Sequence, residues 1–278
     1  MTGSYTGNGV DNRNITGIGF QPDIVIIRYD TNTAAVIRTT NMAADRAKLI
    51  TGNNALQADY IQSFLADGFQ IGTNANVNTS GRLYHWTAMK AGANVQIGTY
   101  AGNGVDNRDI TGVGFQPDWV ITMADNEQDV FRPGPIVGDN SFLMNGSAAI
   151  ADRIQAMLAD GFQIGANANV NSAVRTYYWI AFDATAKVKT GVYTGNSADN
   201  RNITGLGITP RFTWVKRGAT TQAVWRTDTV VGDRTLYWGV TAAVTDRLQS
   251  LLADGFQVGT NQEVNLSGQT YYYLAAAP

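Results

Sequence analysis

The chain has 278 residues, no cysteine and a formal net charge of −2. The absence of cysteine excludes a disulfide framework, a thiolate metal site and a cysteine nucleophile. The net charge offers no basic surface, so we expect no binding of nucleic acid. No stretch approaches the ~18 consecutive apolar residues of a membrane span, so we expect no membrane insertion.

A recurring motif divides the chain. The stretch GNGVDNRNITGIGFQPD from Gly7 returns as GNGVDNRDITGVGFQPD from Gly102 and as GNSADNRNITGLGITPR from Gly195. The period of roughly 94 residues is too long for a solenoid repeat and is typical of a small domain. We therefore predict three tandem domains. They cover residues 1–91, 92–185 and 186–278.

Composition and turn residues predict an all-β fold. Thr, Val, Ile, Tyr and Trp, which suit strands, are common, whereas the helix formers Glu and Lys are scarce. Each copy is expected to be an antiparallel β-sandwich of about 93 residues with its own core. In the first copy the expected strands are Gly3–Thr6, Ile15–Phe20, Ile24–Tyr29 and Ala35–Thr39, separated by Asn-Gly, Asp-Asn and Pro-Asp turns.

The segment before each Asp-Gly-Phe fits two structures. In DRIQAMLADG from Asp152, Ile154, Met157 and Leu158 have helical spacing, and Gly161 lies where a helix would end. The same residues can also form a hairpin with the following GFQIG through an Asp-Gly turn. In either case we expect the glycine of this motif to adopt a positive φ and the phenylalanine to fill the core.

An aromatic segment, RLYHWTAM from Arg82, is predicted to be the last strand of the first copy. Bulky side chains alternate on both of its faces, which indicates a strand buried on both sides. The alternative is a platform on which sugar rings stack.

The motif Asp11-Asn12-Arg13 is the first candidate for a functional site. As a functional loop it would offer a carboxylate, an amide and a guanidinium to a ligand or partner. As a structural element it would be a turn closed by Asp–Arg pairing before the next strand. The same three residues recur as Asp106, Asn107 and Arg108, and as Asp199, Asn200 and Arg201.

The loops after the third expected strand differ most between the copies, which suggests that each copy faces a different neighbour. Arg38, Arg132 and Arg226 recur within these loops. We expect each arginine to pair with an aspartate of its own copy, with contact to a ligand or partner as the alternative. The aspartates are Asp45, Asp139 and Asp233. Trp225 and Trp238 are expected to be exposed and to contact partner proteins.

Catalytic groups are few. His85 is the only histidine, and tyrosines, Tyr178 and Tyr272, stand at its equivalents. The two glutamates, Glu127 and Glu263, are not equivalent either. We therefore expect no enzyme and no cofactor, while calcium binding by Asp and Asn oxygens stays open.

The motifs GxYTGNG, ITGxGFQPDxV, DGFQxG and VNxSGxxY together resemble a repeat of bacteriophage and prophage virion proteins, notably tail-associated ones. In similar sequences the segment before DGF looks strand-like, which favours the hairpin. The second copy departs from the pattern at NSAVRTYYW, where the Ser-Gly turn is missing.

The resemblance implies a non-catalytic structural or adhesion protein, such as a tail-fibre, spike or capsid-decoration component. Its partners would be other virion proteins, and a homo-oligomer is open. We expect it in the virion, made in the host cytoplasm without a signal peptide, since none is recognisable. The alternative function is a lectin-like module with three sites for host-surface polysaccharide. Whether the copies form a closed threefold ring or a linear row is left open.

Overall fold

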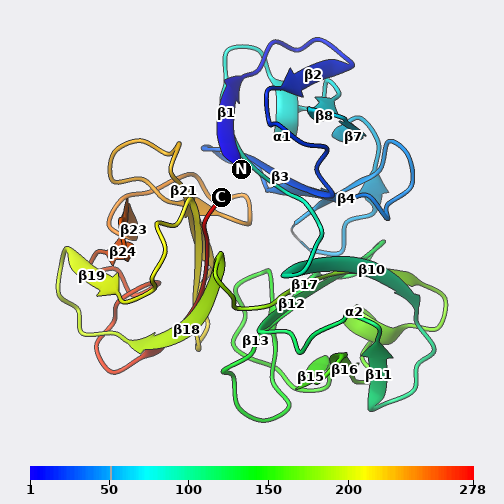
Figure 1. Ribbon diagram of the computed structural model, residues 1–278, viewed down its shortest axis with the longest axis vertical. Helices are drawn as coiled ribbons and strands as arrows, with labels where there is room; N and C mark the ends of the chain where they lie inside the picture. Colours follow the sequence, from blue (N-terminus) through cyan, green and yellow to red (C-terminus); the bar gives the residue numbers. More distant parts are fainter. Residues whose placement is uncertain (51) are drawn as a thin grey trace.

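Three similar lobes surround a central axis in the computed structural model, which describes residues 1–50 and 52–278. We call residues 1–91 lobe 1, residues 92–185 lobe 2 and residues 186–278 lobe 3. Both chain ends lie near the axis (Figure 1). Lobe 3 returns to lobe 1, where the amide of Ala35 donates to the carbonyl of Trp238 over 2.9 Å. The copies therefore form a ring, not a linear row.

The lobes share one order of strands, to which lobe 1 adds β6, and lobes 1 and 2 each add a short helix. In lobe 1 the elements are β1 (Thr2–Thr6), β2 (Arg13–Thr16), β3 (Ile24–Tyr29), β4 (Val36–Thr39), β5 (Ala47–Leu49), β6 (Leu56–Gln57), β7 (Ile61–Leu65), β8 (Gly68–Ile71), α1 (Ala75–Asn78) and β9 (Leu83–Met89). In lobe 2 they are β10 (Val95–Ala101), β11 (Arg108–Thr111), β12 (Trp119–Ala124), β13 (Val130–Pro133), β14 (Phe142–Leu143), β15 (Ile154–Leu158), β16 (Gly161–Ile164), α2 (Ala168–Asn171) and β17 (Thr176–Phe182). In lobe 3 they are β18 (Val188–Thr194), β19 (Arg201–Thr204), β20 (Phe212–Arg217), β21 (Val224–Thr227), β22 (Leu236–Tyr237), β23 (Leu248–Leu252), β24 (Gly255–Val258) and β25 (Thr270–Ala276).

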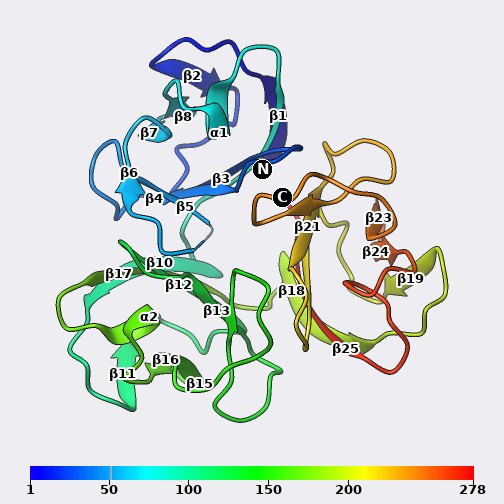
Figure 2. The ribbon, with the colours of Figure 1, turned by 180° about the vertical axis from the view of Figure 1, so that it is seen from behind.

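Every lobe is an antiparallel sandwich of a large and a small sheet, as predicted. The large sheet of lobe 1 has the order β1-β9-β3-β4-β5-β6, and the small sheet has the order β2-β8-β7. Lobe 2 pairs β10-β17-β12-β13-β14 with β11-β16-β15, and lobe 3 pairs β18-β25-β20-β21-β22 with β19-β24-β23. The small sheets lie on the outside of the ring (Figure 1), and β5, β13 and β21 lie beside the axis (Figure 2).

The central strand of each large sheet is buried on both faces. In β3 all six residues are buried. Because side chains alternate along a strand, Val25 and Ile27 pack into the core of lobe 1, while Ile24 and Ile26 point to the axis. This explains why these strands have near-continuous apolar sequences.

An apolar cluster on the axis joins the three lobes. It holds Ile24 and Ile26 from lobe 1, together with aromatic residues from lobes 2 and 3. The ring centroid of Trp214 lies 4.8 Å from that of Trp119, 4.5 Å from that of Phe131 and 4.7 Å from that of Trp238. Each lobe therefore has its own core, as predicted, and also shares a fourth core that the sequence did not reveal.

The segment before each Asp-Gly-Phe is a strand, which confirms the hairpin. In lobe 1, Leu65 pairs with Gly68, so the two turn residues are Ala66 and Asp67 and not the predicted Asp-Gly. The φ of Gly68 is 152°, and a Cβ there would lie 2.0 Å from the carbonyl oxygen of Ile15. Phe69 is fully buried. Both expectations for this motif are confirmed.

The second expected strand is shorter than predicted, because it ends at Thr16. Gly17 and Gly19 have φ angles of 85° and 86° and leave the extended region. Their amides donate to the two carboxylate oxygens of Asp67, over 3.0 and 2.5 Å. A carboxylate distant in sequence therefore ends this strand.

The aromatic strand β9 is buried on both faces, as predicted. Tyr84 and Trp86 pack in the core of lobe 1, and His85 on the other face is 2% exposed. A Cβ at Gly3, on the neighbouring strand, would lie 2.1 Å from the Trp86 ring. The glycine in this position lets the indole lie flat against the sheet.

We predict that Trp214→Ala destabilises the whole ring. The truncation leaves a cavity in the shared cluster, so the free energy of unfolding should fall by about 3–5 kcal/mol. Val231→Ala, at a site 70% exposed, is the matched control and should change it by about 0.5 kcal/mol or less. Chemical denaturation measures both. Lobes 1 and 2 unfolding at an unchanged midpoint in the Trp214 variant would contradict a shared core.

Candidate functional site

The three Asp-Asn-Arg motifs form exposed turns on the rim of the ring, just before β2, β11 and β19 (Figure 1). In lobe 1 a carboxylate oxygen of Asp11 accepts the amide of Asn12 over 2.8 Å, and the other accepts its side-chain Nδ2, also over 2.8 Å. Gln62 of β7, the far strand of the same small sheet, donates to Asp11 over 2.9 Å. The φ of Asn12 is 55°, a value that asparagine tolerates. Asp106 with Asn107 and Gln155, and Asp199 with Asn200 and Gln249, repeat these bonds.

The predicted pairing of Asp11 with Arg13 is wrong. The guanidinium of Arg13 donates to the carbonyl of Thr6 over 2.6 Å and lies 5.2 Å from the ring centroid of Tyr5. It folds back over its own lobe, because the strand after the turn directs it to β1. Arg108 and Arg201 take the same position over Tyr100 and Tyr193.

A buried asparagine, whose role the sequence did not reveal, holds each rim turn to the lobe. Asn78 is fully buried. Its Nδ2 donates to the carbonyls of Val10 and Gly72 over 2.8 and 2.9 Å, and its Oδ1 accepts the amide of Asn8 over 3.0 Å. Asn171 and Asn265 bind the turns of lobes 2 and 3 in the same way. The recurrence of Val-Asn before each aromatic strand was the available signal.

The recurring arginines of the variable loops do not reach the surface. Arg38 is 6% exposed and donates to the carbonyls of Arg46 and Ile61 over 3.1 and 2.9 Å. The predicted partner Asp45 instead accepts the amide of Asp59 over 3.0 Å. Burial lowers the pKa of the arginine. Arg132 and Arg226 are equally buried and also donate to carbonyls. Neither the ligand contact nor the predicted ion pair is therefore correct.

The expectation of exposed tryptophans is also wrong. Trp225 is fully buried and Trp238 is 1% exposed. Their ring centroids are 5.4 Å apart, within the shared cluster on the axis. Both were expected in the variable loops, but Trp225 lies in β21, and the side that faces solvent in an isolated sandwich faces the other lobes here.

Much of the variable sequence lies between the lobes. At the boundary of lobes 1 and 2, the fully buried amine of Lys48 donates to the carbonyls of Ala124 and Glu127, each over 2.8 Å. It also lies 3.6 Å from the carboxylate of Asp129. Burial raises the pKa of Asp129 to about 7 although the lysine opposes this shift.

Each of the other two boundaries holds its own buried cation. Between lobes 2 and 3, the amine of Lys216 lies 4.6 Å from the ring centroid of Phe142, and burial lowers its pKa to about 7. Between lobes 3 and 1, Arg28 donates to the carbonyl of Thr241. Phe142 occupies in lobe 2 the register position that Lys48 occupies in lobe 1. The three boundaries are thus built from different chemistry at equivalent positions.

The single histidine also lies at a boundary. The Nδ1 of His85 is 2.9 Å from the hydroxyl of Thr229 in lobe 3. Burial lowers the pKa of His85 from its usual 6.5 to about 4, which keeps the imidazole neutral near pH 7.

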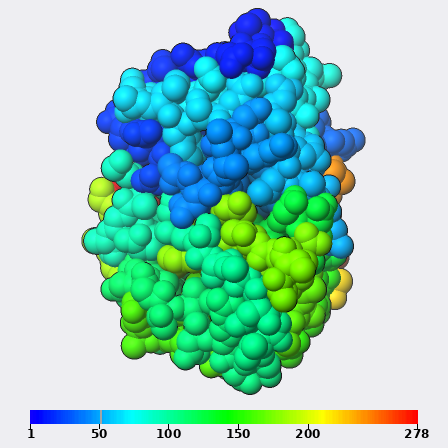
Figure 3. All heavy atoms as spheres, turned by 90° about the vertical axis from the view of Figure 1, so that its right-hand side faces the viewer, coloured from blue at the N-terminus to red at the C-terminus, as the bar shows by residue number. Residues whose placement is uncertain are grey.

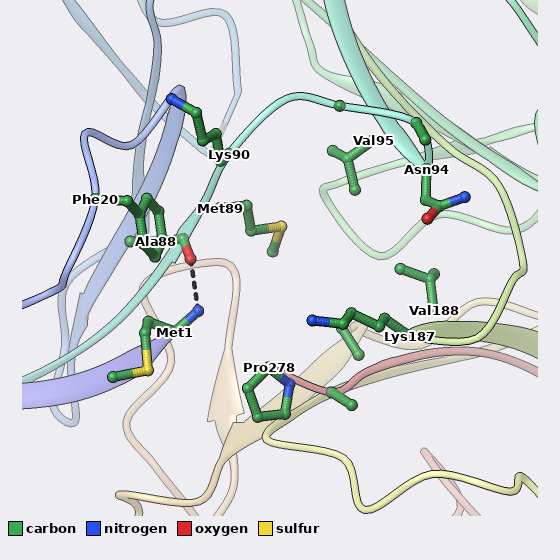
Figure 4. A pocket seen from close by; sticks show the side chains of 14 residues that line it. Met1, Phe20, Ala88, Met89, Lys90, Asn94, Val95, Lys187, Val188 and Pro278 are labelled. Carbon is green, nitrogen blue, oxygen red and sulfur yellow. Dashed lines mark hydrogen bonds between the residues drawn. The ribbon is translucent and has the colours of Figure 1, made fainter.

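A cavity of about 280 Å³ opens on the axis beside the connections between lobes (Figure 4). Val95 and Val188, at the starts of β10 and β18, line it with Met89 and Phe20, and the amine of Lys187 points into it (Figure 4). Val95 and Val188 pair with Phe182 and Ala276, the last residues of β17 and β25. In lobe 1 the first residue of β1, Thr2, pairs with Thr87, so the last two residues of β9 extend beyond β1. The cavity lies where this difference leaves lobe 1 less covered.

The described residues contain no group of three or more His, Cys, Asp or Glu side chains placed to hold a metal ion. None of the helices in the described part of the chain has the length and apolar character that crossing a membrane requires.

A family model described as a domain of unknown function, DUF7483, matches residues 1–98 and 183–275. These two segments cover most of lobes 1 and 3. Neither the curated proteins nor the solved structures contain a match to the chain.

We predict that Asn78→Ala loosens the rim turn of lobe 1. Its loss leaves a buried amide and two carbonyls without their partner, so the free energy of unfolding should fall by about 1–3 kcal/mol. Asn76→Ala, at a half-buried position two residues away, should cost about 0.5 kcal/mol or less. Hydrogen exchange of Asn8 and Val10 should accelerate only in the first variant. Equal stability of the two variants would refute the structural role.

Acid should weaken the boundary between lobes 3 and 1 through His85. Its folded pKa lies below its unfolded value, so the stabilisation is complete above pH 6.5 and is lost as the pH falls toward 4. A shift from 6.5 to about 4 corresponds to about 3 kcal/mol. Against His85→Gln, the wild-type protein should therefore lose about that much more stability between pH 7 and pH 4. Parallel stability curves for the two proteins would exclude this titration.

Proposed function

The chain belongs to the DUF7483 family of domains of unknown function, and from its architecture we propose that it is a non-catalytic structural or adhesion protein of a bacteriophage particle. In this role it is a tail-fibre, spike or capsid-decoration component. Its partners are other proteins of the particle.

The first support is the resemblance of four spaced motifs to a repeat of virion proteins. The structure gives these motifs a common purpose within the lobe. The ITGxGF segment and Asp67 end β2, the DGF glycine packs against β2 directly after the hairpin turn, and the asparagine of VN holds the rim turn. The motifs therefore specify a lobe, and the resemblance is one of architecture.

The observation that carries the proposal is the constancy of the rim turns. Three exposed turns present the same carboxylate and amide, while equivalent buried positions between the lobes differ, as Lys48 and Phe142 do. An exposed valine, Val10 or Val105, precedes the aspartate in the first two lobes and is 58% or 57% exposed. Hydrogen-bonding groups beside a small apolar residue suit a protein contact surface.

A ring of three lobes also matches the symmetry of particle components. Homo-oligomers with closed symmetry present the same patch once per subunit. A single chain with three equivalent rim turns offers the same three patches without assembling from subunits. It can bind a threefold partner at all three turns at once, and the linked contacts reinforce one another.

The lectin-like alternative with three equivalent sites loses its predicted platform. Tyr84, Tyr177 and Tyr271 of the aromatic strands are fully buried in the lobe cores. A sugar ring cannot stack on these three tyrosines without unfolding the sandwich. The neighbouring residues on the other face are not equivalent, because His85 is buried whereas Tyr178 and Tyr272 are half-buried.

We predict that the rim turns are protected in the assembled particle. Particles would be purified from cells that encode the chain, the protein identified in them by mass spectrometry, and its hydrogen exchange compared with that of the free protein. Amides of residues 8–13, 103–108 and 196–201 should exchange at least about tenfold more slowly in the particle, because the contact suppresses local opening.

The triple variant Asp11→Ala, Asp106→Ala and Asp199→Ala should reduce incorporation into particles. The matched control changes three exposed side chains of the small sheets, Asn14→Ala, Asp109→Ala and Asn202→Ala, and should incorporate normally. Absence of the wild-type protein from purified particles would overturn the proposal.

A further inference from the structure

A groove on the flank of the ring separates lobe 1 from lobe 2. Figure 3 shows this flank, where blue residues of lobe 1 meet green and yellow-green residues of lobe 2. The groove encloses about 480 Å³, within the range of roughly 300–1,000 Å³ typical of ligand sites. Its lining includes Arg46 and Leu56 from lobe 1, and Asp125, Arg175, Thr176 and Tyr178 from lobe 2.

The equivalent groove between lobes 3 and 1 is closed. There Arg234, the counterpart of Arg46, donates to Asp30, the counterpart of Asp125, over 2.6 Å. Only about 20 Å³ remains, beside Val231 and the buried His85. An arginine–aspartate pair across the boundary thus seals this groove.

In the open groove the same two residues do not pair. The carboxylate of Asp125 accepts the amide of Leu56 over 2.6 Å instead. Arg46 is exposed, and its guanidinium has no hydrogen-bond or ion-pair partner among the described residues. An arginine that elsewhere closes the boundary is therefore free at the mouth of this groove.

The second arginine of the groove is held in place by its own lobe. Arg175 donates through Nε to Glu127 over 2.9 Å and through Nη1 to the carbonyl of Asp125 over 2.7 Å. Since Arg175 and Glu127 neutralise each other, the guanidinium of Arg46 and the carboxylate of Asp125 are the charged groups that the groove leaves to a ligand. Tyr178, half-buried, adds a ring, and Thr176 adds a hydroxyl.

We propose that the groove between lobes 1 and 2 binds an acidic sugar, a uronic-acid residue of a polysaccharide. The guanidinium of Arg46 pairs with the sugar carboxylate, for which its planar fork of donors is suited. The Tyr178 ring and Leu56 pack against the C–H face of the pyranose. Thr176 and Asp125 are left for the hydroxyl groups. This site goes beyond the proposed structural role and does not depend on it.

The test is a titration of the full chain with trigalacturonic acid, followed by isothermal calorimetry and by chemical shifts of the Arg46 and Tyr178 backbone amides. Cellotriose is the neutral comparison, and acetate is the comparison for the anion alone. The trisaccharide acid should bind and should move these amides, whereas cellotriose and acetate should bind at least about tenfold more weakly.

Arg46→Gln should weaken binding of the acid by about tenfold or more while leaving the melting temperature unchanged, because the side chain is exposed. The matched control is Arg234→Gln, which removes the equivalent arginine from the sealed groove and should leave affinity unchanged. Equal affinity for cellotriose or acetate, unchanged binding by Arg46→Gln, or no binding at millimolar trisaccharide would each overturn the proposal.

Discussion

The whole ring depends on one constraint, that the large sheet of each lobe must bury both of its faces. One face packs on the small sheet of its own lobe, and the other brings Ile24, Trp119 and Phe212 to the axis. An isolated lobe would expose this second face to water, where an apolar patch of that size is unfavourable. Closure of three lobes around a common cluster removes it, so the ring is the minimal unit in which every sheet is covered.

A ring made from one chain can differ at each boundary, and this one does. Lys48, Lys216 and Arg28 are desolvated cations that need acceptors or an aromatic face in the adjoining lobe. Placed against the wrong lobe, such a buried charge would keep only the acceptors of its own lobe, and losing part of its partners costs far more than a lost surface contact. The divergence of the repeats thus fixes the order of the lobes, a role that identical interfaces of a homotrimer could not fill.

The contacts between lobes change the functional interpretation of the variable loops. Their divergence suggested different external neighbours, but many of the differing residues contact the next lobe of the same chain. The features that stay constant, above all the rim turns held by Asn78 and its counterparts, become the better guide to shared contacts. Conversely, a groove that is open between lobes 1 and 2 but sealed between lobes 3 and 1 favours a ligand site at the open boundary.

The pattern of the segment before each Asp-Gly-Phe fitted a helix or a hairpin, and the resemblance favoured the hairpin. The sequence by itself determined the three repeats, the all-β class and the burial of the aromatic strands. Each of these follows from local turn chemistry or from alternation along a strand. Only the tertiary structure decided that Trp225 and Trp238 face the axis, that Arg13 turns back over Tyr5, and that Asn78 holds the rim turn. Alternation distinguishes two faces of a strand but cannot say whether water or another lobe covers each one. Likewise, a polar side chain does not reveal its partner when that partner lies far away along the chain.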